Sequence, residues 1–240
     1  MNNNKNFFHE YIWILRSRTA VLLGKLIHFR FHNKVCALKY KDKSFIVLPE
    51  VFHPSHHWSG TFLAKYLAVK PGDHVLDMGT GSGIQAICSA SVAEKVLACD
   101  INPHAIKCAT INALLNDVSN KVEVRQSNLF ENVKENEKFD LIIFNFPFFH
   151  INPKSIEEHA YFGGKDGHVM KNFYKQVGKH LKPHGKIQII YSESAIPDMF
   201  EWDEFKKNRF KPELVIMKKS LLGHKVPIYL LSKDSDGKEA

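Results

Sequence analysis

A glycine-rich turn is the first candidate for chemistry in the sequence. Gly79, Gly81 and Gly83 lie at alternate positions, directly after one apolar run and before another at 84–90. Glycine permits positive φ angles and close approach of the backbone to a ligand, and the N–H groups at the start of a helix face that ligand. The usual dinucleotide fingerprint has its last glycine one residue later, so a hydride-transfer enzyme is the weaker interpretation.

Two acidic residues near this turn suit a nucleoside cofactor with a cationic end. Asp77 precedes the turn, where a carboxylate would attract an ammonium group and repel a pyrophosphate. Asp100 ends the next apolar run, where it can accept hydrogen bonds from both ribose hydroxyls, because Asn102 is available to cap the helix that follows. After the third run, Asn128 can reach an adenine edge. The predicted cofactor contacts are Asp77, Gly79, Thr80, Gly81, Gly83, Asp100, Ile101, Asn128, Leu129 and Asn145.

A second turn, Asn145-Phe146-Pro147-Phe148, follows the fourth apolar run and indicates the reaction. An amide or base nitrogen is a poor nucleophile, so a catalyst must hold it in line with the group that it attacks. The Asn145 side-chain oxygen and the Phe146 carbonyl can each accept one N–H. Pro147 stiffens the turn, and the Phe148 ring can lie over a planar group. These four are the predicted catalytic residues, and they need neither a metal nor a strong base.

The motifs resemble those of class I methyltransferases that use S-adenosyl-L-methionine, and in particular the HemK-like glutamine methyltransferases with their Asn-x-Pro-aromatic signature. The likeness spans roughly residues 47 to 195. It includes residues 76–84, 100–103 with Ala105, 139–142 and 163–167. The resemblance implies S-adenosyl-L-methionine as the cofactor. It also implies N-methylation of a planar amide or amino nitrogen, in a glutamine-like protein acceptor or a smaller molecule.

Departures from that family bear on the substrate. The family usually has a second proline where Phe146 stands, a tyrosine where Phe148 stands and an acid where Asn128 stands. Residues 51–61, which line the cofactor and substrate pocket in the family, lack its acidic residues here and carry histidines. We therefore expect an altered acceptor. The predicted substrate contacts are His53, His56, His57, Trp58 and His150.

Three alternatives follow from charge and histidine content. His53, His56 and His57 could share an ion, but no Cys or acidic partner stands at a recognisable spacing, so we predict no metal. The net charge of +8 favours a polyanion, which makes an RNA or DNA base amino-methyltransferase the alternative function. No recognisable RNA-binding module accompanies the charge, so a protein or small-molecule acceptor is favoured over nucleic acid. A non-catalytic S-adenosyl-L-methionine-binding module is a more distant alternative.

The elements that must position these motifs alternate between extended and helical patterns. Connections of crossover length separate the first five runs, which predicts a parallel sheet, whereas the last two runs are joined too closely for a crossover and should pair antiparallel. The predicted strands are 74–78, 95–100, 122–126, 140–145, 186–191, 213–218 and 226–231. The fold class is α/β: a Rossmann-like, seven-stranded, mostly parallel sheet with an antiparallel last strand.

An N-terminal annex precedes this sheet. Apolar residues at helical spacing from Phe7 to Leu26 predict an amphipathic helix, and runs at 34–40 and 44–49 predict a β-hairpin. Basic residues interrupt the helix, so it is not a membrane span, and it lacks the features of a secretory signal. Four cysteines without a CxxC pair indicate a reducing compartment, and we predict the cytoplasm. The oligomeric state stays open. The predicted divisions are an annex at 1–57, a methyltransferase domain at 58–233 and a flexible tail at 234–240.

Overall fold

The computed structural model describes residues 34–54, 58–190, 198–219 and 225–234. The predicted N-terminal helix lies outside the described residues, as do His56, His57 and nearly all of the predicted tail. Within the described ranges, no helix has both the length and the apolar character needed to cross a bilayer.

A seven-stranded sheet forms the centre of the protein. Its strands are β3 (His74–Met78), β4 (Lys95–Asp100), β5 (Val122–Gln126), β6 (Phe139–Asn145), β7 (Leu181–Ile190), β8 (Phe210–Lys219) and β9 (Lys225–Lys233). Their order across the sheet is β5-β4-β3-β6-β7-β9-β8. The pairs from β5 to β7 are parallel, and β9 runs antiparallel to both β7 and β8. The predicted fold class and its antiparallel last strand are confirmed.

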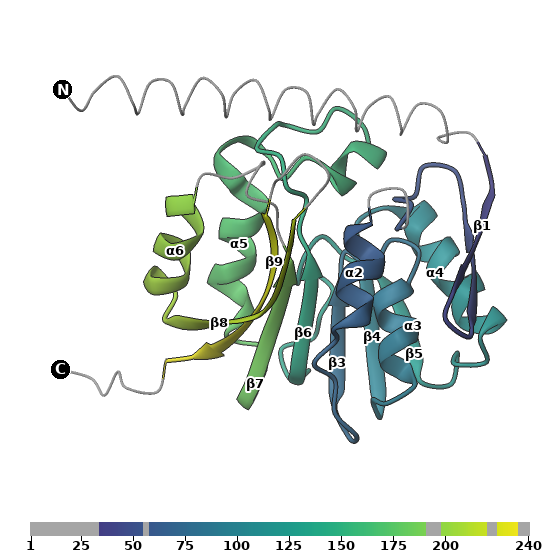
Figure 1. Cartoon of the computed structure of the whole chain (residues 1–240), viewed down its shortest axis with the longest axis horizontal. Helices are drawn as coiled ribbons and strands as arrows, with labels where there is room; N and C mark the ends of the chain where they lie inside the picture. The colour runs from purple at the N-terminus through teal and green to yellow at the C-terminus, as the bar shows by residue number, and fades with distance from the viewer. Residues whose placement is uncertain (1–33, 55–57, 191–197, 220–224, 235–240) are drawn as a thin grey trace.

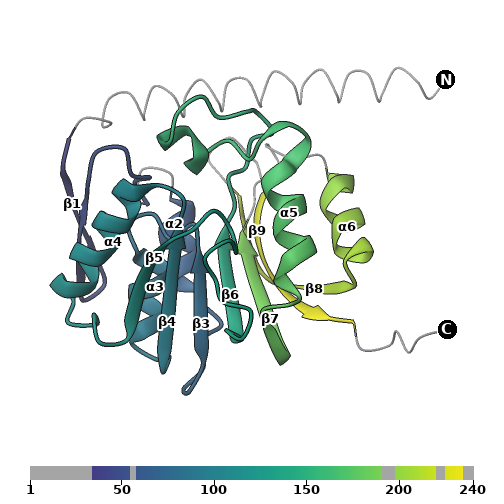
Figure 2. The same ribbon diagram turned by 180° about the vertical axis from the view of Figure 1, so that it is seen from behind.

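Helices cover both faces of the sheet, as Figures 1 and 2 show from opposite sides. The helices α2 (Ser59–Lys65), α3 (Ile84–Ala90) and α4 (Pro103–Leu115) pack on one face. The helices α5 (His168–Val177) and α6 (Asp198–Lys207) pack on the other. Two short 3-10 helices, η1 (Glu157–Ala160) and η2 (Lys165–Gly167), lie in the connection from β6 to α5. The predicted hairpin is present as β1 (Cys36–Tyr40) and β2 (Lys43–Val47), which form a separate antiparallel sheet.

The central strands carry apolar side chains on both faces. Successive side chains of a strand point to opposite faces, so a continuous apolar run such as 141–144 supplies both. Leu141 and Ile143 of β6 belong to the hydrophobic cluster under α2 and α3. Ile142 and Phe144 belong to the cluster under α5. All four side chains are buried. The continuous apolar runs in the sequence therefore reflect a sheet that is covered on both sides.

The strand β7 is longer than predicted and passes through Pro183. Its register with β6 shifts between Phe139 and Leu141. Gly185 lies at this irregularity, where an added Cβ would come within 2.6 Å of the Phe139 carbonyl oxygen. The irregular pairing accommodates Pro183, which has no backbone N–H group to donate to β6. The strand β8 also begins earlier than predicted and includes Pro212, which an edge strand tolerates.

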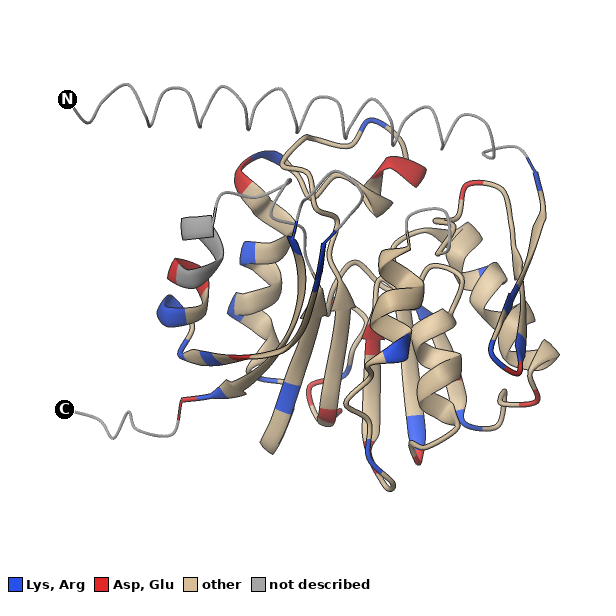
Figure 3. Ribbon diagram, viewed as in Figure 1, with Lys and Arg blue, Asp and Glu red and all other residues tan. Residues whose placement is uncertain are grey.

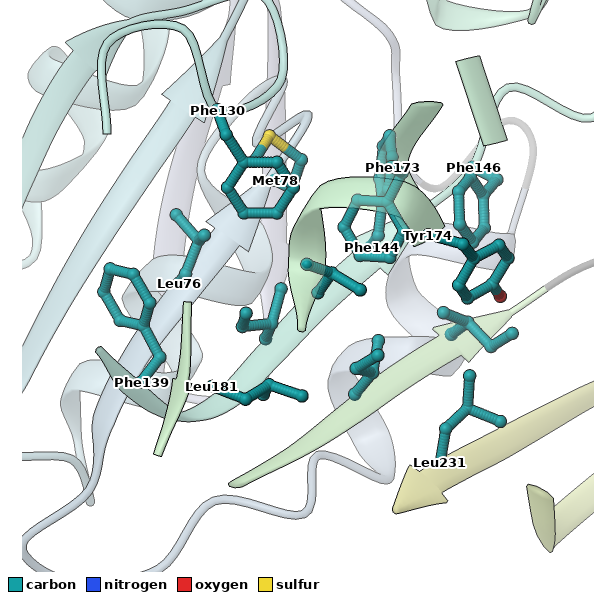
Figure 4. Packing of buried hydrophobic residues seen from close by; sticks show 14 of the residues in the cluster. Leu76, Met78, Phe130, Phe139, Phe144, Phe146, Phe173, Tyr174, Leu181 and Leu231 are labelled. Atoms are coloured by element: carbon teal, nitrogen blue, oxygen red, sulfur yellow. The ribbon is translucent and has the colours of Figure 1, made fainter. Parts of the chain in front are cut away.

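Aromatic rings fill the cluster beneath the second turn (Figure 4). The Phe146 ring is 3% exposed, and its centroid lies 4.2 Å from that of Phe144 and 5.3 Å from that of Phe173. Phe173 of α5 is fully buried and also packs against Phe130 and Tyr174. The side chain of Phe146 is thus part of the core, and its burial holds the backbone of the turn in place.

We expect Phe173→Ala to lower the free energy of unfolding by about 3–5 kcal/mol, because it leaves a cavity among four aromatic rings. Urea denaturation followed by circular dichroism measures this loss. Leu214→Ala is the control, since Leu214 is 50% exposed on the edge strand, and it should change stability by less than about 0.5 kcal/mol. Similar losses in the two variants would contradict the central place of Phe173 in the core.

Candidate active site

A cavity lies at the carboxyl edge of the sheet, where open α/β folds bind their ligands. The glycine-rich turn, the ends of β4 and β6, the turn after β5, the residues before α2 and the η1 helix form its walls. Nine predicted site residues come together in this lining. They are Gly79, Thr80, Gly81, Asp100, Ile101, Asn128, Leu129, Asn145 and Pro147.

Asp77 lies beneath the glycine-rich turn and is only 2% exposed. Its Oδ2 accepts a hydrogen bond from the Thr80 hydroxyl at 2.6 Å and another from the Ala86 N–H at 3.0 Å. Burial raises the pKa of Asp77 to about 7, although these two hydrogen bonds oppose the shift. The cavity lining does not include Asp77. Its observed contacts connect the end of β3 to the first turn of α3.

Asp100 holds the same turn from the neighbouring strand. Its Oδ2 accepts the Gly81 N–H at 2.8 Å, and its Oδ1 accepts the Asn102 N–H at 2.9 Å. Burial raises the pKa of Asp100, while backbone N–H groups and the charge of His159 oppose the shift. The Asn102 side chain caps α4 by accepting the His104 N–H at 2.9 Å, as predicted. Because Asp100 lines the cavity, its carboxylate can serve both the turn and a ligand.

Two glycines of the turn are required for different reasons. Gly81 has a φ of 55°, and no atom lies within 4 Å of the position that a Cβ would occupy. That open space belongs to the cavity wall, so a ligand can approach the backbone there. Gly83 has a φ of 83°, and a Cβ on it would lie 3.2 Å from Ala109 and Ile87. Gly83 does not line the cavity, and it instead allows the start of α3 to pack against α4.

The second turn places one unpaired acceptor at the cavity. The Oδ1 atom of Asn145 is buried and has no hydrogen-bond partner among the described residues. Asn145 and Pro147 line the cavity, whereas Phe146 is directed into the core. Phe148 is half-buried and packs against the same aromatic cluster. A buried amide oxygen without a donor is costly, unless a bound molecule supplies an N–H.

Of the predicted substrate contacts, the structure describes His53, Trp58 and His150, and these three are not among the residues that line the cavity. His53 is 9% exposed between two residues that do line the cavity. Trp58 precedes α2, and the Nζ atom of Lys218 lies 4.9 Å from the centroid of its ring system. His150 follows the second turn, and burial lowers its pKa. Their contacts with an acceptor stay predictions.

Sequence reasoning missed the residues that cover the cavity from the connection between β6 and α5. Ile156, His159 and Ala160 line the cavity, and the latter two belong to η1. The Nδ1 atom of His159 lies 3.0 Å from the Ser155 carbonyl oxygen, which orients the ring. This connection therefore contributes both apolar surface and an imidazole to the site.

Gly163 explains how that connection returns to the second turn. An added Cβ would lie 2.9 Å from the Pro147 carbonyl oxygen, so a larger residue would push the two segments apart. The Gly163 N–H donates to the Phe149 carbonyl at 2.8 Å, and the Phe149 N–H donates to the Tyr161 carbonyl at 2.9 Å. The glycines at 163–167 were the available sequence signal for a close contact with the Asn145 turn.

The strand order and the position of the cavity define a Rossmann-like methyltransferase fold. A ribosomal protein L11 methylase from Lactobacillus delbrueckii subsp. bulgaricus has a similar structure, with a TM-score of 0.56 and 23% sequence identity. The similarity covers 78% of this chain and 84% of that chain. Residues 42–200 match the family model described as the methyltransferase small domain. The chain belongs to this methyltransferase family.

Two relatives in sequence are named as glutamine methyltransferases. A protein of Methanocaldococcus jannaschii, provisionally named protein N5-glutamine methyltransferase, is 37% identical over 153 residues, which are 60% of this chain and 73% of that protein. A release factor glutamine methyltransferase of Koribacter versatilis is 32% identical over 187 residues, which are 70% of this chain and 66% of that enzyme. The HemK-like resemblance inferred from the motifs is confirmed.

The buried carboxyl group of Asp77 predicts a pH dependence of stability. Its pKa is about 7 in the folded protein, against an ordinary value of 3.8. Between these values the folded protein keeps a proton that the unfolded chain has lost. The contribution of Asp77 to the free energy of unfolding should therefore fall as the pH rises from about 4 to about 7, by at most about 1.4 kcal/mol per pH unit. Urea denaturation at a series of pH values measures how the free energy of unfolding changes with pH. Between about pH 4 and pH 7 this slope should be less steep in Asp77→Asn than in the wild-type protein.

Asp42→Asn is the control for removing a carboxylate, because the Asp42 side chain is 81% exposed in the hairpin turn. We expect this variant to retain the slope of the wild-type protein. A slope that is equally steep in Asp77→Asn would contradict the role of Asp77 as the titrating group.

Proposed function

We propose that this protein is an S-adenosyl-L-methionine-dependent N-methyltransferase whose acceptor is a glutamine-like amide nitrogen in a protein. The observation that carries the proposal is the buried, unpaired Oδ1 atom of Asn145 in the cavity wall. An acceptor amide has N–H groups that can satisfy this oxygen.

The cavity has groups that fit the proposed cofactor. Asp100 would accept hydrogen bonds from the ribose hydroxyls, since its carboxylate lies in the wall. Asn128 and Leu129 would contact the adenine from the turn after β5, and the open position at Gly81 allows close approach to the backbone. Asp77 would contribute to cofactor binding mainly by holding the glycine-rich turn in its conformation, through its hydrogen bonds with Thr80 and Ala86. When bound, S-adenosyl-L-methionine supplies a methyl group on a positively charged sulfur.

The second turn would hold the acceptor nitrogen. Asn145 Oδ1 and the Phe146 carbonyl would each accept one N–H, which directs the nitrogen lone pair toward the methyl group. The nitrogen would form a bond to the methyl carbon as the carbon–sulfur bond breaks with its electron pair left on sulfur, and one N–H proton would pass to solvent water. Pro147 and the buried Phe146 ring would hold the two accepting oxygen atoms in place, so the site would need little reorganisation during the reaction. Phe148 would cover one face of the planar amide.

The names of the two relatives favour a protein glutamine as the acceptor over a nucleic-acid base. In the part of the chain that the structure describes, the lysines and arginines are spread over several elements (Figure 3), which gives no support to a single phosphate-binding face there. We also place the reaction in the cytoplasm, and the free thiol groups of all four cysteines support a reducing compartment.

Two substitutions should separate acceptor positioning from cofactor binding. Asn145→Ala should retain the affinity for S-adenosyl-L-methionine in calorimetry, while turnover falls by about 10²–10³-fold. The variant loses one of the two oxygens that would accept a hydrogen bond from the nitrogen on which positive charge develops. Gly81→Val should abolish cofactor binding, since a side chain would fill the open position at a strained φ. Unchanged turnover in Asn145→Ala would exclude the proposed role of the second turn.

The class of acceptor can be tested by transfer of a labelled methyl group into a cell extract. We expect the label to enter material that is destroyed by protease and resistant to nuclease, and acid hydrolysis should release no label on the purine bases. The Asn145→Ala variant serves as the background control. Label in nuclease-sensitive material would instead support the base amino-methyltransferase.

A further inference from the structure

A fully buried amide side chain on α4 connects the hairpin to the glycine-rich turn. The Oδ1 atom of Asn112 accepts the Ile46 N–H at 2.7 Å. Its Nδ2 atom donates to the Ile46 carbonyl at 2.7 Å and to the Ser82 carbonyl at 2.9 Å. Asn112 is 0% exposed, and its hydrogen bond to Ser82 is buried, whereas the two to Ile46 are partly buried. One side chain therefore contacts both strand β2 and the wall of the cavity.

Asn116, one helical turn later, provides a natural comparison. Its Oδ1 atom accepts the Ser44 N–H at 3.1 Å, and its Nδ2 atom donates to the Ser44 carbonyl at 2.7 Å. Four residues of helix rise about 6 Å, close to two residues of a strand. Both asparagines thus pair with the backbone of β2, at Ser44 and Ile46. Of these two side chains, that of Asn112 also reaches the glycine-rich turn, through its hydrogen bond to the Ser82 carbonyl.

The hydrogen bond to Ser82 fixes one peptide group of the turn. The Ser82 carbonyl is held by Asn112, and the N–H of the same peptide group, which belongs to Gly83, donates to the Thr80 carbonyl at 2.8 Å. The N–H of Gly81, earlier in the same turn, is held by Asp100 at the end of the neighbouring strand β4. Ser82 is 2% exposed, so without Asn112 its carbonyl would lose a partner that water cannot easily replace.

We propose that Asn112 is a positioning residue for the cofactor-binding turn, and that it couples the position of the hairpin to that turn. The cofactor part of this inference rests on the proposed function, whereas the position of the turn does not. Loss of the amide would release the peptide group between Ser82 and Gly83, and the outward face of the turn would no longer be held in one conformation.

The test compares Asn112→Ala with Asn116→Ala, which each remove a pair of hydrogen bonds to β2. Both variants should lower the Tm. In hydrogen–deuterium exchange without cofactor, we expect faster exchange over residues 79–86 in Asn112→Ala and wild-type rates there in Asn116→Ala. In calorimetry, we expect about tenfold weaker binding of S-adenosyl-L-methionine in Asn112→Ala only, as the loss of roughly one hydrogen bond predicts.

Equal exchange over residues 79–86 in the two variants would overturn the inference, whatever the Tm values. If Asn112→Ala does not fold, Asn112→Leu replaces it, because a side chain of similar volume leaves no large cavity and still has no group that can donate to the Ser82 carbonyl. Should the wild-type protein fail to bind S-adenosyl-L-methionine while the two variants still differ in exchange, the proposed function fails and the positioning role of Asn112 stands.

Discussion

Two carboxyl groups at the ends of neighbouring parallel strands hold the glycine-rich turn. Asp77 accepts the N–H of Ala86, and Asp100 accepts the N–H of Gly81. Adjacent strands lie about 4.8 Å apart, so residues at their carboxyl ends reach the same loop from two sides. The contact from Asp77 satisfies the N–H of the fully buried Ala86, and the contact from Asp100 fixes an N–H group in the cavity wall. The open face of the turn, and with it the cavity, depends on this arrangement.

The second turn, at residues 145–148, is held in a different way from the glycine-rich turn. Its turn is held by a ring packed among aromatic side chains, because Phe146 is buried against Phe144 and Phe173. The replacement of the family's second proline by Phe146 thus exchanges a stiff backbone for a side chain anchored in the core. The two oxygens proposed to accept hydrogen bonds from the substrate nitrogen belong to Asn145 and to the Phe146 backbone, and neither is charged. Their partial negative charges suit a reaction in which a neutral amide acquires positive charge.

The annex is closely joined to the methyltransferase fold. The predicted boundary at residues 57 and 58 stays a prediction, but hydrogen bonds from Asn102 to the Glu50 carbonyl and from Asn112 to Ile46 cross it. The family match also begins inside the hairpin, at residue 42. Phe52 lines the cavity from the segment between the hairpin and α2. The cavity is therefore completed by residues that precede the sheet.

Sequence patterns were enough to predict the sheet, its antiparallel strand and the two turns, because alternation, strand length and glycine spacing are local signals. They also indicated part of the cavity lining, including Gly79, Gly81, Asp100 and Asn145. Tertiary structure decided which of the two acids faces the cavity, since Asp77 is covered by the turn that it holds. It also brought His159 and Asn112 to the site. Asn112 contacts the backbone of Ile46 and Ser82, which are far from it in the chain, and no local pattern encodes which distant backbone groups a buried side chain will meet.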